Sequence, residues 1–458
     1  MQNDWAYTEV FGVQLWDPRC RNTLASALQR LGEHAQLSFS RALGSQRKAI
    51  SRILHHKDTR AHDLLRGHIG ATSLRCQNAG FVLIASDTTS ADFTTHPATT
   101  GLGLVSDKKH QKGFLIHTAL AMTPAGIPLG VLHQHSWVRD PQADSTAKER
   151  RKRGFDEKES YKWVQALQGV QAALPVGTRA LLIQDREADV FNFFVAPRRP
   201  EIDLLLRAVQ PRCLQTPDPD GARTILEAVA QAPVVATTTV AVRARPDQEA
   251  RDAHLQVRVA EVSIRVPVNG KSTSTEPVVL RIVRASEENA PEGVKEPLKW
   301  VLLTTLAIPD AATALVVVGY YAKRWLIERF HFVLKSGCGF ERLQLDQFRT
   351  LQKALSLYSI VAWRLLHLTY LAREAPTTPA LEAISPVEKE VLERATGHKI
   401  VTVAQALLAV ARIAGFRPVP SAPTPGVKSL WLGFRQLNDM VAGFLLARQP
   451  PPVLTGQD

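Results

Sequence analysis

Four residues, Tyr321, Arg324, Glu328 and Lys335, have types and spacing suited to chemistry on a phosphate backbone. At about 100° per residue they fall within roughly 60° of one another on a helical wheel. Apolar side chains take the opposite face of this predicted helix, at Leu326, Phe330, Val333 and Leu334. A carboxylate can hold Mg²⁺, and arginine, lysine and a tyrosine hydroxyl can bind a phosphodiester. The alternative is a solvated face on which Arg324 and Glu328 form an ordinary i,i+4 ion pair.

Two further carboxylates follow apolar runs that predict buried strands. Asp87 comes after the run at 81–85, and Asp185 comes after the run at 180–184. An acid at the carboxyl end of a buried strand can project into a cleft beside the sheet. Either aspartate could instead be a helix cap or a turn residue. Together with Glu328, the two would make a three-carboxylate site able to hold two Mg²⁺ ions.

The spacing Tyr-x2-Arg-x3-Glu-x6-Lys resembles the signature of the insertion-sequence-four family of bacterial DDE transposases, the YREK group. The likeness extends in order along nearly the whole chain, through residues 17–19, 87–90, 132–134, 157–160, 185–189, 297–300 and 409–416. The resemblance implies that Asp87, Asp185 and Glu328 are the catalytic metal ligands for two Mg²⁺ ions, with Mn²⁺ as a substitute. It also implies that the other three signature residues hold the terminal DNA phosphate.

The pattern of apolar runs predicts an α/β catalytic domain over residues 75–376. Strand-like runs lie at 81–85, 114–121, 127–132, 180–184 and 202–207, with a helix over 157–173. Together with the resemblance, this order fits an RNase H-like core. The interval between Asp185 and Glu328 is too long for the one helix and strand this core needs. Runs rich in valine and threonine at 234–242, 255–268, 278–283 and 300–306 predict an antiparallel β insertion at about 212–307.

Two residues in or beside this insertion are candidates for DNA contact. Trp300 matches the position of a family tryptophan used during DNA hairpin formation, and an aromatic ring can hold an extruded base by stacking. Its alternative role is that of a buried residue opening a strand. Arg207, which ends the fifth predicted strand, is the second candidate.

The first region, residues 1–74, is predicted to be helical and basic, and its candidate DNA-binding residues are Arg41, Arg47, Lys48 and Arg52. The whole chain of 458 residues carries a formal net charge of +13, which favours a polyanionic partner. A basic helical surface without DNA contacts is the alternative. In the resembled family this region recognises the transposon end.

The last region, residues 377–458, is predicted to be helical, with apolar faces at 403–414 and 430–446 that could pack on themselves or on a partner subunit. The resemblance implies a dimerisation domain here, hence a homodimer in the paired-end complex. The scattered cysteines Cys20, Cys76, Cys213 and Cys338 argue against structural zinc and suit a reducing compartment. We expect no membrane partner and a bacterial cytoplasmic location, on the nucleoid when bound to DNA.

The sequence therefore predicts a cut-and-paste transposase that binds double-stranded DNA at terminal inverted repeats and at the target. The family implies nicking, hairpin formation and opening, and joining of 3′ ends to target DNA by two-metal phosphoryl transfer. An RNase H-like nuclease or resolvase could use the same acids for hydrolysis alone. A noncatalytic DNA-binding relic of a transposase is the other alternative.

Overall fold

The structure is a computed structural model of the chain and describes residues 5–34, 37–106, 110–139, 153–218, 220–242, 249–268, 272–294, 296–420 and 423–449. The amino-terminal helices are α1 (Trp5–Val10), α2 (Arg19–Glu33), α3 (Phe39–Leu43), α4 (Arg47–His55) and α5 (Ala61–Ala79). The strands are β1 (Phe81–Asp92), β2 (Gly103–Leu104), β3 (Lys112–Met122), β4 (Pro128–Trp137), β5 (Arg179–Gln184), β6 (Ile202–Arg207), β7 (Val234–Val242), β8 (Arg251–Ile264), β9 (Val278–Ser286) and β10 (Lys299–Thr304). The helices among and after them are α7 (Lys162–Ala173), α8 (Phe191–Phe194), α9 (Ile225–Gln231), α10 (Ala311–Ala322), α11 (Trp325–Phe332), α12 (Phe348–Glu374), α13 (Pro386–Thr396), α14 (Val403–Ile413) and α15 (Val427–Ala447).

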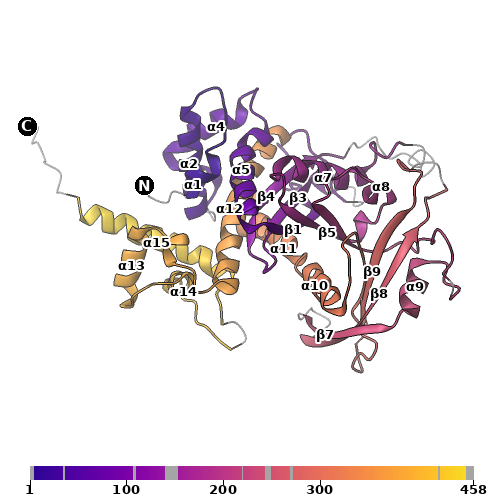
Figure 1. The fold of residues 1–458 in the computed structure, drawn as a ribbon. Helices are drawn as coiled ribbons and strands as arrows, with labels where there is room; N and C mark the ends of the chain where they lie inside the picture. Colours follow the sequence, from indigo (N-terminus) through magenta and orange to yellow (C-terminus); the bar gives the residue numbers. More distant parts are fainter. Residues whose placement is uncertain are drawn as a thin grey trace, which may run out of the picture.

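One 10-stranded sheet forms the centre of the molecule, with strand order β2-β3-β1-β5-β6-β10-β9-β8-β7 and β4 paired to β3 (Figure 1). β1 runs antiparallel to β3 and parallel to β5, and β5 runs parallel to β6. The core strands β1, β3 and β4, followed by α7, β5, α8 and β6, match the predicted order of three strands, helix, strand, helix and strand. The α/β class is therefore confirmed, and the sheet is consistent with that fold.

Helices cover both faces of the core strands. Val82 and Ile84 lie in one hydrophobic cluster with residues of α7, whereas Leu83 and Ala85 lie in another with residues of α11 and α12. Successive side chains of a strand point to opposite faces, so β1 needs apolar residues at every position. This explains the uninterrupted apolar run that precedes Asp87.

The predicted β insertion continues the central sheet. The antiparallel strands β7 to β10 lie within 212–307, and β10 pairs with β6 through Leu302 and Arg207. Without β10, β6 would expose an unpaired backbone edge. The extended sheet therefore places residues of the insertion directly beside the core strands.

The amino-terminal helical region is closely attached to the core. The predicted boundary at residue 74 lies inside α5, which continues to Ala79 and packs on β4 and α12. A Cβ atom at Gly67 of α5 would lie 2.5 Å from the backbone oxygen of Glu9, so glycine allows α1 to cross α5 at close range. The Glu9 carboxylate pairs with His68 and Arg75 of α5. The amino-terminal helical region therefore ends at Ala79, five residues later than predicted. The helix α5 continues past residue 74 because it packs both on α1 and on the core elements β4 and α12.

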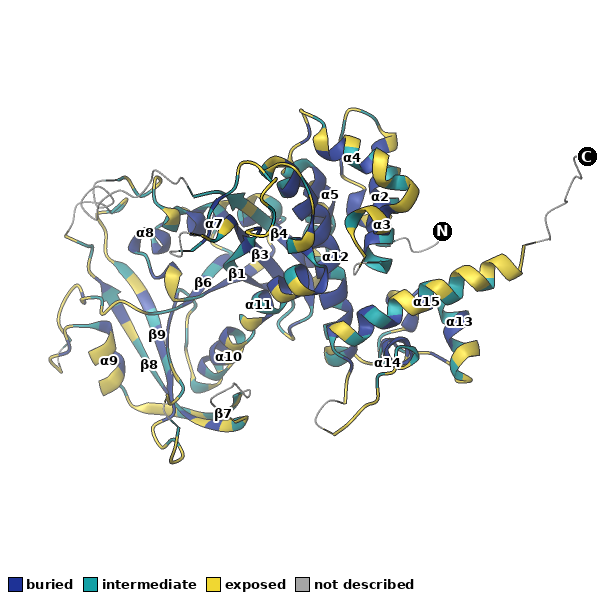
Figure 2. Ribbon diagram, turned by 180° about the vertical axis from the view of Figure 1, so that it is seen from behind, coloured by how far each residue is buried: buried dark blue, intermediate teal, exposed yellow. Residues whose placement is uncertain are grey.

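The helix α12 is the central buried helix of the protein (Figure 2). By length and composition it is the one described helix that could cross a membrane, but 83% of its most apolar window is buried inside the protein. That burial is typical of a core helix. The carboxy-terminal helices α13, α14 and α15 pack together with the end of α12, and the far end of α15 is exposed (Figure 2).

Candidate active site

Sheet register places Asp87 and Asp185 side by side. β1 and β5 are parallel, with Leu83 opposite Leu181 and Ala85 opposite Ile183. Two residues further on, the same register brings Asp87 next to Asp185, on strands that lie about 4.8 Å apart. The pairing itself ends at Ala85 and Ile183, and β5 ends at Gln184, so the position of Asp185 beside Asp87 extends this register by two residues.

The prediction that Asp87 follows the end of its strand is wrong. β1 continues to Asp92, because it pairs with β3 beyond the point where β5 stops, and Asp87 lies opposite Thr118. Asp185 does follow its strand, and its Oδ1 accepts a hydrogen bond of 2.8 Å from the backbone N–H of Glu187. The two acids therefore meet at the carboxyl end of β5, one within a strand and the other in a turn.

The four signature residues do not lie on one helix, contrary to the prediction. Tyr321 is in the last turn of α10 and only 6% exposed. A tight turn at Lys323 and Arg324 separates it from α11, which carries Glu328, and Lys335 lies in a following π-helical turn at Val333–Gly337. α10 packs on β7, β8 and β9, whereas α11 packs on β1 and β3. The sheet twists between these strands, so one straight helix cannot follow both.

Arg324 connects the third acid to the first. Its Nη2 atom is ion-paired with Glu328, and its Nη1 atom lies 3.8 Å from Oδ2 of Asp87. The i,i+4 pair considered as an alternative from the sequence is therefore present, and Asp87 is a further partner of the same guanidinium. Through Arg324, the structure brings Glu328 of α11 to the edge where the two aspartates meet.

The electrostatics of this group favour an added cation. Burial raises the pKa of Asp87 to about 6; the Arg324 charge opposes this rise, whereas the charges of Asp185 and Glu328 add to it. Burial also raises the pKa of Asp185, although the hydrogen bond from the Glu187 amide opposes it. Partly buried carboxylates that disfavour one another's ionisation are common at functional sites.

The donor chemistry fits Mg²⁺ or Mn²⁺, since carboxylate oxygens are the ligands these hard cations prefer. Within the described parts of the chain, however, no three histidine, cysteine, aspartate or glutamate side chains stand close enough to surround one ion. In the present arrangement, Arg324 holds the carboxylates of Asp87 and Glu328.

The predicted DNA contacts are partly gathered here. The Trp300 ring of β10 meets the Tyr321 ring edge-on, with centroids 5.3 Å apart. Arg207 donates a hydrogen bond of 3.2 Å to the backbone oxygen of Lys299, and its charge acts on Tyr321. These three side chains and Arg324 therefore form one neighbourhood.

Lys335 lies further along β1 than the acids. Its Nζ atom donates to the backbone oxygen of Ser90 at 2.8 Å and pairs with Glu341 at 3.1 Å. Ser90 is three residues beyond Asp87, roughly 10 Å along a strand. Lys335 therefore lies beside β1 like the acids, but outside the immediate group around Arg324.

The basic residues predicted to bind DNA lie elsewhere, on α3 and α4. All four side chains are exposed, and none takes part in an ion pair with a described residue; they are Arg41, Arg47, Lys48 and Arg52. Ile50, Ile53 and Leu54 of α4 are buried beneath them. The helix thus packs by its apolar face and presents its cations to solvent.

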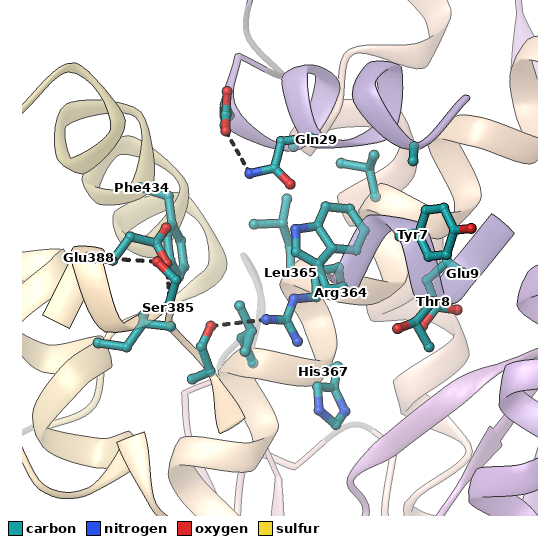
Figure 3. A pocket seen from close by; sticks show the side chains of 18 of the residues that line it. Tyr7, Thr8, Glu9, Gln29, Arg364, Leu365, His367, Ser385, Glu388 and Phe434 are labelled. Carbon is teal, nitrogen blue, oxygen red and sulfur yellow. Dashed lines mark hydrogen bonds between the residues drawn. The ribbon is translucent and has the colours of Figure 1, made fainter. Parts of the chain in front are cut away.

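A cavity of about 810 Å³ lies apart from the acids, among α1, α2, α12, α13 and α15 (Figure 3). Arg364 enters it from α12 and donates a hydrogen bond of 2.9 Å to the backbone oxygen of Ala383, while Glu388 and Phe434 approach from the other side (Figure 3). None of the three acids lines it. The candidate active site is therefore the carboxyl end of β5, where Asp87 and Asp185 meet, and not this cavity.

Sequence reasoning missed one charged residue near this edge. Lys162, the first residue of α7, is only 7% exposed, and its charge acts on Asp185. Its ion-pair partners Glu159 and Glu187 lie within the segments 157–160 and 185–189, both singled out by resemblance. The presence of both segments in one chain was the signal in the sequence that could have pointed to Lys162.

A mixed α/β sheet with one acid in a strand, a second directly after the neighbouring parallel strand and a third on a helix against the sheet is consistent with an RNase H-like fold. Residues 137–364, just under half of the chain, match the family model of the transposase DDE domain. This match includes Asp185, Arg324 and Glu328, whereas Asp87 precedes it. The protein therefore carries a transposase DDE domain, and the prediction is confirmed at that level.

A solved structure is also similar, a cryo-electron microscopy structure of the piggyBac transposase synaptic complex with hairpin DNA. The identity is 9% and the TM-score 0.33, over 99% of this chain and 76% of that chain. A likeness this low carries no argument about function.

Proposed function

We propose that this DDE transposase is a cut-and-paste enzyme of the insertion-sequence-four family. It binds the terminal inverted repeats of its element, excises the element through nicks and hairpin ends, and joins the 3′ ends to target DNA. The observation that carries the proposal is the convergence of Asp87 and Asp185 at the carboxyl end of β5, with Glu328 joined to Asp87 by Arg324.

Asp87, Asp185 and Glu328 would hold two Mg²⁺ ions, for which Mn²⁺ would substitute. Bound ions would activate the attacking oxygen and stabilise the leaving oxygen of each displacement at phosphorus. Asp87 lies within β1 and Asp185 directly follows the neighbouring strand β5, so the sheet keeps the two backbones close to each other. This rigidity suits a site in which ligand geometry decides the rate.

The arginine and its neighbours would orient the DNA. A guanidinium has five N–H donors, so Arg324 can keep Glu328 while it donates to a phosphate oxygen. Tyr321 would bind the terminal phosphate beside Arg324, and Lys335, further along β1, would reach the same end of the DNA from the other side. Trp300, which contacts Tyr321, lies where a base extruded near that phosphate could stack.

Recognition of the ends and pairing of two subunits would use the terminal regions. The exposed cations of α3 and α4 suit the DNA backbone, because each phosphate contact releases counterions. The exposed end of α15 would contribute to the homodimer of the paired-end complex. Double-stranded DNA and a second copy of the chain are thus the proposed partners.

The test compares alanine variants of the three acids in nicking, strand transfer and end binding. Asp87→Ala, Asp185→Ala and Glu328→Ala should each abolish Mg²⁺-dependent nicking and transfer of precut ends, and retain binding of the end DNA. Glu261→Gln is the control, because this acid is exposed on β8 and pairs with Arg281.

Two outcomes would contradict the proposal. Metal-dependent cleavage by any of the three purified alanine variants would remove that acid from the site. Wild-type protein that nicks DNA but never joins precut ends to a target would be a nuclease.

A further inference from the structure

Lys162 is a buried cation in an unfavourable place. It occupies the first position of α7, where the helix dipole disfavours positive charge, and it is 7% exposed. Lysine is almost never this buried unless it is paired. Its partners are Glu187, with Nζ to Oε2 at 3.1 Å, and Glu159, with Nζ to Oε1 at 3.8 Å.

Glu187 connects this lysine to a proposed metal ligand. Its side chain pairs with Lys162, and its backbone N–H donates the 2.8 Å hydrogen bond to Oδ1 of Asp185. Glu187 lies in the single 3-10 turn Arg186–Ala188, and Asp185 is the residue that caps this turn. One residue therefore holds the carboxylate of Asp185 with its backbone while its own side chain is held by α7.

Glu159 holds the same lysine from the other side, but it does not touch the turn. Its carboxylate accepts hydrogen bonds of 2.9 and 3.0 Å from Arg139, which follows β4. Lys162 thus has one partner, Glu187, that is hydrogen-bonded to Asp185, and one partner, Glu159, that is bound to Arg139 instead. This difference provides a matched control within the same cluster.

We propose that Lys162 and Glu187 are positioning residues for Asp185. Their ion pair fixes the turn after β5, so the Asp185 carboxylate faces Asp87 in the orientation that binds a divalent cation. The inference rests on the proposed role of Asp185 as a metal ligand.

A purely structural role would give a different pattern. The Glu187 side chain is 61% exposed, and ion pairs with so exposed a partner contribute little to stability. Lys162 also lies 5.5 Å from the centre of the Trp163 ring, where it could simply support α7. In that case only Lys162 would matter, and its loss would lower the melting temperature without changing metal affinity.

The test measures Mn²⁺ affinity of the full-length protein by calorimetry, with Asp185→Ala as the blank. Glu187→Gln and Lys162→Gln should each raise the dissociation constant about tenfold, the lower range for residues that orient metal ligands. The double variant should be no weaker than either single variant, because both act through one contact. Lys162→Arg should restore most of the affinity, and Glu159→Gln should stay within about twofold of wild type.

The half-saturating Mg²⁺ concentration for nicking should shift in parallel, with the rate at saturating metal nearly unchanged. Glu187→Gln folds whether or not Lys162→Gln does, since its side chain is mostly exposed. Wild-type affinity in Glu187→Gln, or additive effects in the double variant, would overturn the inference and leave the proposed function intact. Wild-type protein whose Mn²⁺ binding is insensitive to Asp185→Ala would instead overturn the proposed metal site and this inference with it.

Discussion

Arg324 lies within 3.8 Å of Asp87 while it is ion-paired with Glu328, so one guanidinium joins a strand acid to a helix acid. The tight turn between α10 and α11 makes this possible. It places Arg324 directly before the first residue of α11, the helix that packs on β1. A cation bound by the same carboxylate oxygens would compete with the guanidinium for them. We therefore expect Arg324 to orient the carboxylates of Asp87 and Glu328 and to bind a phosphate of the DNA.

Replacing this arginine should separate binding from chemistry. We expect Arg324→Gln to lower the nicking rate by about 100-fold or more, the effect of losing one donor aimed at developing charge, and to change end binding only a few-fold. Arg324→Lys should be intermediate, because lysine keeps the charge without the two-sided fork. Arg329→Gln is the control, since Arg329 lies over the Phe332 ring on the same helix. Nicking rates and gel shifts measure both effects, and a near-normal rate in Arg324→Gln would refute the role.

Trp300→Ala should uncouple hairpin formation from first-strand nicking. Nicking depends on the acids, whereas a hairpin requires distorted terminal base pairs, and aromatic stacking returns about 1–3 kcal/mol per base. The variant should accumulate nicked ends, with hairpin yield reduced about tenfold, and precut ends should still transfer. Trp300→Phe keeps a ring against Tyr321 and should retain most hairpins. Denaturing gels that show normal hairpins from Trp300→Ala would make Trp300 a packing residue.

Removing single cations from α4 should weaken end binding through phosphate contacts. Lys48 and Arg52 are exposed and have no ion-pair partner among the described residues. Lys48→Gln or Arg52→Gln should each reduce the slope of log affinity against log salt by about 1. Lys389→Gln is the control, since Lys389 is paired with Glu393 on α13. An unchanged salt slope in both α4 variants would exclude this helix from the interface.

The exposed end of α15 should support pairing of two ends. Leu446 is 68% exposed there, whereas Leu430 and Leu437 of the same helix are fully buried. Leu446→Glu should therefore leave the fold and single-end binding intact and reduce the paired-end complex. Val176→Glu is the control, because Val176 is 84% exposed in a loop before β5. Mass photometry that finds normal paired complexes from Leu446→Glu would place the dimer contact elsewhere.

The contact between α1 and α5 should make stability depend on acid. Burial raises the pKa of Glu9, but the His68 ring and the Arg75 guanidinium outweigh it and lower the pKa to about 2. Because the folded pKa is below the usual 4.5, the stabilisation is complete above about pH 4.5 and is lost as pH falls towards 2.

Glu9→Gln should therefore unfold more readily than wild type at pH 7, and the difference should close as the solution is acidified. Chemical denaturation followed across this range measures it. The reverse trend, a difference that grows on acidification, would show that Glu9 is not ionised in the folded protein.

The sequence by itself determined the core strands and singled out the three candidate acids. Continuous apolar runs predicted the five core strands, since strands buried on both faces need apolar residues at every position. Val234–Val242 was predicted to the residue, because alternation and β-branched residues are local signals. Asp87, Asp185 and Glu328 were candidates from their residue types, their spacing and a resemblance, before any contact between them was known.

Only the tertiary structure decided which residues meet. The register that sets Asp87 beside Asp185 joins positions far apart in the chain, and so does the contact of Arg324 with Asp87. The break between α10 and α11 follows from packing on different strands of a twisted sheet, and no glycine or proline lies between Tyr321 and Glu328 to predict it. The pairing of Lys162 with Glu187 likewise joins a helix start to a distant turn. Local patterns report only which face of an element is buried, whereas contacts between elements depend on how the whole core packs.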